Sequence, residues 1–140
     1  MTAYAGNLQT PSGRFAIVAA RFNSFIVDRL TDGARDGLTA HGVAADQIDI
    51  VHVPGALEIP LAAEFLAKSG RYVGILCLGA IIEGETSHYD VVVQQSARGI
   101  ADVALRHRVP VLNAILTTHT LDQAINRAGG KAGNKGFEVA

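Results

Sequence analysis

Four short apolar runs, each followed by a helical pattern, are the feature that most limits what this chain can fold into. The runs cover residues 14–20, 48–53, 72–78 and 109–116, and their apolar residues are nearly continuous. Continuous apolarity is typical of strands that are covered on both faces, as in a parallel sheet. The alternating order therefore predicts an α/β fold with a four-stranded parallel sheet and helices on both faces.

Apolar residues at helical spacing fill the segments between these runs. The first helix is expected to follow Asn23 or Ser24, and its inward positions lie four residues apart: Ile26, Leu30, Ala34 and Leu38. The second helix is expected to begin near Pro60 and to bury Leu61, Phe65 and Leu66.

The remaining helices are marked by their ends. A long helical pattern is expected to open over residues 84–86. Thr120 and Gln123 predict a capping box for a further helix, which Gly129 and Gly130 would stop.

Composition excludes several classes of protein. The 140 residues suit one domain, with 12 basic against 13 acidic residues and no charge excess that would attract nucleic acid. A single cysteine, Cys77, excludes a disulfide framework and a cysteine zinc cage. The longest apolar stretch, residues 73–82, is about half of a membrane span, and residues 2–9 do not form a signal peptide. We expect a cytoplasmic protein that binds neither nucleic acid, membrane nor metal.

The carboxyl ends of the predicted strands indicate where a functional site would lie. Ligands of open α/β folds bind outside the carboxyl ends of the strands, which here lie near Phe22, Gly55, Gly84 and Thr117. Phe22 suits stacking on a planar heterocycle, or else packing beneath the next helix. Glu58 suits hydrogen bonds to a polyol, although stabilising a helix dipole would also explain it.

The third strand end carries the clearest chemistry. Free backbone N–H groups of residues 84–86 at a helix start, with the Thr86 hydroxyl, favour a phosphate. His88 follows in the expected first turn and can move protons near neutral pH, although a helix-start histidine is often only a surface residue. Lys131 and Lys135 would bind an anion, or else they belong to a solvated loop.

Four motifs at these strand ends carry a resemblance to a known family. Residues 20–23 (ARFN), 53–60 (VPGALEIP), 78–90 (LGAIIEGETSHYD) and 127–136 (RAGGKAGNKG) together resemble lumazine synthase, an enzyme of riboflavin biosynthesis. The resemblance runs from about Asn7 to the last residue. It implies one domain over residues 1–140, a flavodoxin-like three-layer sandwich, and a cofactor-free condensation of a ribitylamino-uracil with dihydroxybutanone phosphate to dimethyl-ribityllumazine.

The resemblance also implies roles for individual residues. His88 would shuttle protons. The phosphate would bind at Gly84, Glu85 and Thr86, with Arg127 reaching it from a neighbouring subunit. The ribitylamino-uracil would bind at Phe22, Asn23, Ala56, Leu57, Glu58, Ala80, Ile81, Ile82, Asn113 and Lys135.

The chain departs from the family pattern in two places. Asn113 stands where the family usually has a phenylalanine that closes the pocket from the adjacent subunit. The family also continues past the Asn-Lys-Gly run, so Gly136 and the residues after it resemble the opening of a shortened last helix. Family members form pentamers, and some stack pentamers into an icosahedral shell; the compact turn at residues 129–134 resembles the shell-forming type.

Other functions of an α/β fold would require different residues at these strand ends. A flavin or nucleotide module would need a phosphate loop where Arg21 and Asn23 stand, and a phosphorelay receiver would need acidic residues at Arg21 and Gly79. A riboflavin synthase of the archaeal type, which joins two lumazines, stays open. So does a shell protein without catalysis.

Overall fold

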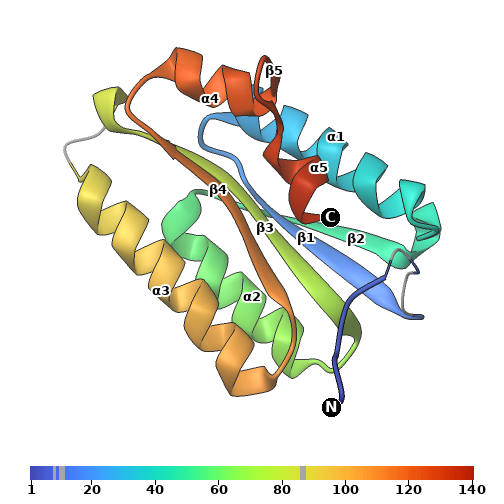
Figure 1. Cartoon of the computed structure of the whole chain (residues 1–140). Helices are drawn as coiled ribbons and strands as arrows, with labels where there is room; N and C mark the ends of the chain where they lie inside the picture. The colour runs from blue at the N-terminus through green and yellow to red at the C-terminus, as the bar shows by residue number, and fades with distance from the viewer. Residues whose placement is uncertain (8, 10–11, 86–87) are drawn as a thin grey trace.

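A parallel sheet forms the middle layer of this computed structural model, which describes residues 1–7, 9, 12–85 and 88–140. The strands are β1 (Arg14–Ala20), β2 (Ile48–Val53), β3 (Tyr72–Ile82) and β4 (Val111–Thr118). They are parallel and lie in the order β2-β1-β3-β4 (Figure 1). The predicted four-stranded parallel sheet and its flavodoxin-like α/β class are confirmed.

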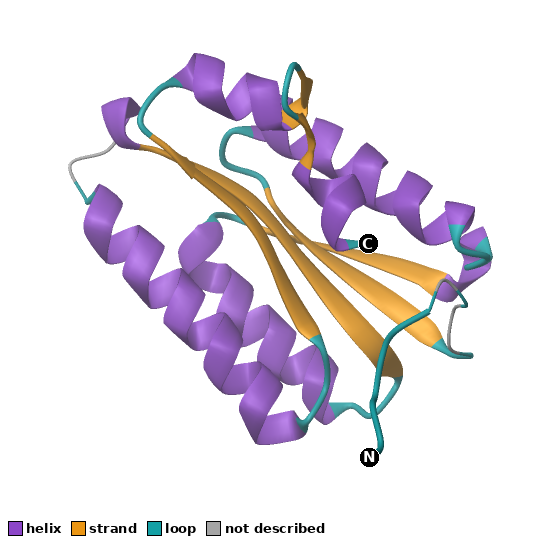
Figure 2. Cartoon of the chain, viewed as in Figure 1, coloured by secondary structure: helices purple, strands orange, loops and turns teal. Residues whose placement is uncertain are grey.

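Helices cover both faces of the sheet (Figure 2). The longer ones are α1 (Ser24–Ala40), α2 (Ile59–Lys68) and α3 (Tyr89–His107). Two short ones, α4 (Leu121–Arg127) and α5 (Lys135–Val139), lie beside α1 on one face, and α2 and α3 cover the other. A small hairpin of β5 (Ala128–Gly130) and β6 (Gly133–Asn134) joins α4 to α5.

Alternate residues of the central strands build two separate cores. Ile17 of β1 packs with Leu30 of α1 and Leu76 of β3 on one side of the sheet. Val18 and Cys77 pack with α2 and α3 on the other. Burial among these apolar groups raises the pKa of the Cys77 thiol to about 12, so this cysteine is an inert core residue.

The predicted helix signals at α4 and α5 are confirmed. Thr120 and Gln123 form the reciprocal capping box of α4, and Gly129 follows with φ 105°, a conformation that favours glycine. The last helix begins at Lys135, one residue before the predicted position. No described helix is both apolar enough and long enough to cross a membrane.

The predicted core face of α2 is wrong for Leu61 and Phe65. These side chains are 63% and 67% exposed, whereas the buried positions are Ile59, Ala63 and Ala67. The helix approaches α3 so closely that a Cβ added at Gly99 would lie 2.6 Å from a Pro60 side-chain atom. Only small residues fit at that distance, so the large ones face outward.

β3 also runs further than predicted. Its pairing with β4 continues to Ile82, which lies opposite Thr118. A 3-10 turn (Glu83–Glu85) follows, and α3 begins at Tyr89 rather than at residues 84–86. Residues 79–82 are therefore strand rather than loop, which brings their backbone to the edge of the sheet where the site was expected.

Candidate active site

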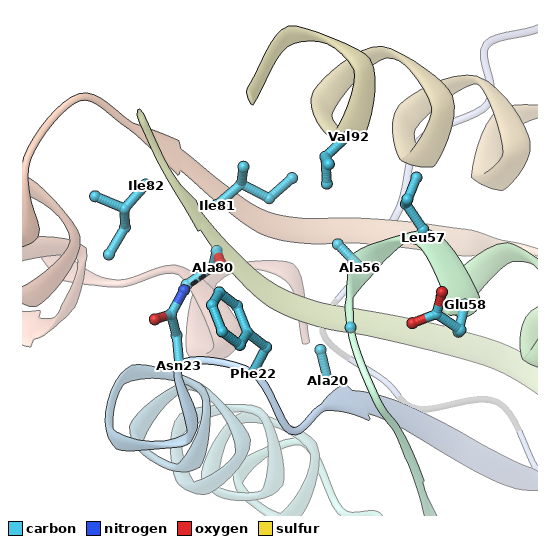
Figure 3. Close-up of a pocket in the computed structure, with 11 residues that line it drawn as sticks. Ala20, Phe22, Asn23, Ala56, Leu57, Glu58, Ala80, Ile81, Ile82 and Val92 are labelled. Atoms are coloured by element: carbon cyan, nitrogen blue, oxygen red, sulfur yellow. Dashed lines mark hydrogen bonds between the residues drawn. The ribbon is translucent and has the colours of Figure 1, made fainter. Parts of the chain in front are cut away.

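A pocket of about 170 Å³ lies at the carboxyl ends of β1, β2 and β3 (Figure 3). It is open on one side, and its walls come from the segments that follow β1 and β2, from the end of β3 and from the first turn of α3. The lining residues are Ala20, Phe22, Asn23, Gly55, Ala56, Leu57, Glu58, Ala80, Ile81, Ile82 and Val92. Most of the residues expected to bind the ribitylamino-uracil are thus brought together in one place.

Hydrogen bonds fasten the segment after β1 to the one after β2. The Arg21 N–H donates to the Val53 carbonyl at 2.7 Å, and the Phe22 N–H donates to the Pro54 carbonyl at 2.9 Å. These bonds extend the ladder between β1 and β2 by two residues beyond the strands. They carry Phe22 to the rim of the pocket.

Phe22 is 60% exposed. Figure 3 shows it between Asn23 and Ala20, with the β3 backbone beside it. A ring buried beneath α1 would be covered, so packing under the next helix does not account for its position. An exposed ring at the rim of an apolar pocket suits stacking on a flat, conjugated ligand.

Glu58 lies at the start of α2, where the sequence expected it. It occupies the cap position, yet its carboxylate accepts no capping hydrogen bond from the helix. A Cβ added at Gly55 would lie 3.3 Å from Glu58 Oε1, so the glycine leaves room for the carboxylate beside the pocket. This acceptor, together with the first turn of α2, suits a hydroxyl-rich ligand.

The end of β3 forms one wall of the pocket. Ala80, Ile81 and Ile82 are the last three residues of β3, and they are buried and line the pocket. Peptide groups at this position can hydrogen-bond the edge of a heterocycle without placing a charge there.

His88 precedes α3 directly instead of lying in its first turn. It is exposed and occupies the cap position, and its carbonyl accepts from the Val92 N–H at 3.0 Å. Val92 lines the pocket, so His88 is one helical turn from the pocket wall. Gly84 and Glu85 belong to the 3-10 turn before it, and the predicted phosphate ligand Thr86 lies outside the described residues.

Three predicted residues lie elsewhere in the described chain. Asn113 is on β4, where its Oδ1 accepts from the Ile115 N–H at 2.9 Å. Lys135 is the first residue of α5. Arg127 ends α4 and lines a second pocket of about 340 Å³ with Thr118 and His119. None of the three lines the first pocket.

Sequence reasoning missed a contact between His119, which lines the second pocket, and Glu83, which follows β3. His119 Nδ1 pairs with Glu83 Oε2, and the rings of His119 and Tyr89 lie 6.0 Å apart. Both partners are exposed, so the pair is worth little in stability. Ala20 and Val92 were also missed, although Val92 follows His88 by one helical turn and is found once α3 is placed.

Comparison with known proteins adds independent information. The family described as 6,7-dimethyl-8-ribityllumazine synthase matches residues 12–140. A protein of that name from Desulfotalea psychrophila (strain LSv54 / DSM 12343) is 55% identical over 135 residues, covering 96% of this chain and 87% of the relative. One from Desulfatibacillum aliphaticivorans is 53% identical over the same shares. The chain therefore belongs to the 6,7-dimethyl-8-ribityllumazine synthase family.

Proposed function

We propose that this chain condenses 5-amino-6-(D-ribitylamino)uracil with 3,4-dihydroxy-2-butanone 4-phosphate to 6,7-dimethyl-8-ribityllumazine, releasing phosphate and water. This is the penultimate step of riboflavin biosynthesis. The observation that carries the proposal is the pocket at the carboxyl edge of the sheet, in a chain of this family. One wall of that pocket suits a flat ring and the other suits a polyol.

The ribitylamino-uracil occupies this pocket. Its pyrimidine ring stacks on Phe22, and the backbone of Ala80, Ile81 and Ile82 meets the ring edge. The ribityl chain runs along Ala56 and Leu57 to the Glu58 carboxylate, which accepts from its hydroxyls. The exposure of the Phe22 ring and the space that Gly55 leaves beside Glu58 support this orientation.

The second substrate enters from the α3 side. Its phosphate binds at Gly84, Glu85 and Thr86, and its ketone lies between the uracil amine and His88. The amine is already a nucleophile, so the protein has to align the two reactants and move protons while the imine forms, phosphate departs and the ring closes. Alignment of this kind lowers a barrier by about 7–11 kcal/mol in well-oriented systems.

The active site is shared between subunits. Arg127, Asn113 and Lys135 reach the pocket of a neighbouring copy, which is consistent with their positions outside the pocket of their own chain. Leu57, Leu61 and Phe65 form an exposed apolar row, spaced four apart, that begins at the pocket wall and continues along α2. Covering this row brings a second subunit to the rim of the pocket.

The assembly is a homopentamer of one-domain subunits in the cytoplasm. Twelve such pentamers form a 60-subunit shell in some family members, and the compact turn between α4 and α5 is compatible with that form. Sedimentation velocity distinguishes a monomer, a pentamer and a shell by mass.

The activity is tested by mixing the purified protein with both substrates and following lumazine fluorescence. We expect fluorescence to appear only when both substrates and the protein are present. Omission of the butanone phosphate is the control. A folded, assembled protein that forms no lumazine would contradict the proposal and would favour a shell protein without catalysis.

A further inference from the structure

Asn23 holds a backbone conformation that few residues other than glycine adopt. Its φ of 61° and ψ of 41° are left-handed, and among the described residues Arg108 is the other non-glycine with positive φ. Asparagine tolerates this region better than most side chains. The turn between β1 and α1 therefore depends on the residue type at position 23.

The Asn23 side chain takes the place of a missing strand neighbour. β1 pairs with β3 as far as Ala19 opposite Leu78, whereas β3 continues to Ile82. Asn23 Nδ2 donates to the carbonyl of Ala80 at 2.8 Å (Figure 3). The amide thus satisfies a carbonyl that β1 no longer reaches, and it ties the end of β3 to the segment after β1.

Backbone bonds hold the same turn from two other directions. The Asn23 carbonyl accepts from the N–H groups of Ile26 and Val27 at 2.9 and 3.1 Å, which opens α1. The neighbouring Phe22 N–H is bonded to the Pro54 carbonyl. The Asn23 side chain makes no cap of its own to α1. The turn at Asn23 therefore joins three walls of the pocket: the segment after β1, the segment after β2 and the end of β3.

We propose that Asn23 is a positioning residue that fixes the gap between the Phe22 ring and the backbone of Ala80, and so preforms the slot for a flat heterocycle. Its left-handed backbone directs Phe22, and its amide anchors the β3 carbonyl. The inference deepens the proposed function and rests on it: Asn23 acts through two residues that touch the ring, whereas the sequence grouped it with the ligand contacts themselves.

Two substitutions separate the backbone from the amide. Asn23→Gly keeps the left-handed conformation and removes the hydrogen bond, because glycine adopts positive φ freely. Asn23→Asp keeps the side-chain shape and turns a carboxylate oxygen toward the Ala80 carbonyl. Arg108→Gly is the matched control, since it relieves the other positive φ at the far end of α3.

The readout is binding of 6,7-dimethyl-8-ribityllumazine, followed by its fluorescence, together with the KM of each substrate. We expect Asn23→Gly to weaken lumazine binding about three- to tenfold, because without this internal bond the free protein holds the slot open only part of the time. Asn23→Asp is expected to weaken binding further. The KM of the ribitylamino-uracil rises in parallel, while the KM of the butanone phosphate stays unchanged. Arg108→Gly binds as the wild type does.

Different failures have different meanings. If the wild type forms lumazine and both Asn23 variants bind it as tightly as the wild type does, the positioning role is overturned and the proposed function stands. An equal rise in both KM values also overturns it, because that pattern is loss of general structure. A wild-type protein that neither forms nor binds the lumazine overturns the proposed function and this inference with it.

Discussion

At the residue scale, we propose that His88 carries out the proton transfers of the reaction. An imidazole changes its charge near neutral pH, and general acid–base catalysis by such a group contributes about 10²–10⁴-fold. The remaining acceleration comes from holding two reactants in line, which requires no titrating group. Loss of the imidazole therefore removes one contribution and leaves the other.

His88→Ala is expected to lower kcat by about 10²–10⁴-fold without abolishing turnover. Lumazine fluorescence under saturating substrates measures this directly, and lumazine binding is expected to stay within a few-fold of wild type. His52→Ala, which changes an exposed histidine of β2 that does not line the pocket, serves as the control. Complete loss of turnover in a folded His88→Ala protein would show that alignment contributes far less than proposed.

A second group of residues sets the response of the fold to acid. At the amino-terminal ends of the strands, Arg14 donates to both carboxylate oxygens of Asp49, at 2.7 and 3.3 Å, and the Tyr72 hydroxyl donates at 2.6 Å. The hydrogen bonds from Arg14 first, and then from Tyr72, lower the pKa of Asp49 from 3.8 to about 2. The charged form is thus favoured in the folded state.

This shift predicts the sign of a pH dependence. A folded pKa below the unfolded value stabilises the protein above about pH 4, and that contribution disappears as the pH falls toward 2. In Asp49→Asn the free energy of unfolding is expected to lose this part of its acid dependence. Urea denaturation at pH 2, 3, 4 and 6 measures it, with Asp122→Asn as the control. Parallel pH profiles for Asp49→Asn and wild type would contradict the assignment.

At the element scale, the start of β1, the end of β2 and the start of α1 follow from the sequence, because Gly13, Pro54 and Asn23 mark them. β3 has no such residue at its end. Gly79 interrupts the apolar run and suggests that the strand stops there, yet the strand continues through it. Only pairing with β4 extends it to Ile82. Local pattern does not contain that information.

The face of α2 could not be read from periodicity either. The helix carries apolar residues around most of its circumference, so large and small positions compete for the core. Close approach to α3 decides in favour of the alanines. The same limit applies to the site: the positions of Phe22, Glu58 and the end of β3 follow from strand order, whereas Asn113, Arg127 and Lys135 lie outside the pocket of their own chain. Local pattern says nothing about which chain's pocket a residue reaches.

The packing of α2 makes a prediction at this scale. Ala63 is fully buried between the sheet and α3, so Ala63→Leu is expected to cost about 1–3 kcal/mol of unfolding free energy through overpacking. Ala101→Leu, the same change at an exposed position on α3, is the control and should stay within about 0.5 kcal/mol of wild type. Equal stabilities of the two variants in urea titrations would contradict the packing described here.

At the scale of the whole molecule, the exposed apolar row begins at the pocket to which, in the proposed assembly, a neighbouring subunit contributes. Leu61 and Phe65 continue from Leu57, which lines the pocket, while Arg127 lies in a different pocket of its own chain. A subunit that covers the row excludes water from the apolar side chains, which stabilises the assembly, and it brings its own residues to the pocket rim. In this proposal catalysis depends on assembly, so a substitution in the apolar row should abolish both.

Phe65→Asp tests this coupling, because a carboxylate buried at a subunit interface is strongly unfavourable. The subunit itself should fold, since the Phe65 ring is already mostly exposed. We expect sedimentation velocity to show monomers, circular dichroism to match wild type, and lumazine formation to fall below detection. Ala45→Asp introduces the same charge at an exposed turn before β2 and should assemble and react normally. A monomeric Phe65→Asp protein with full turnover would contradict the shared site, because no neighbouring copy would then be present to supply Arg127.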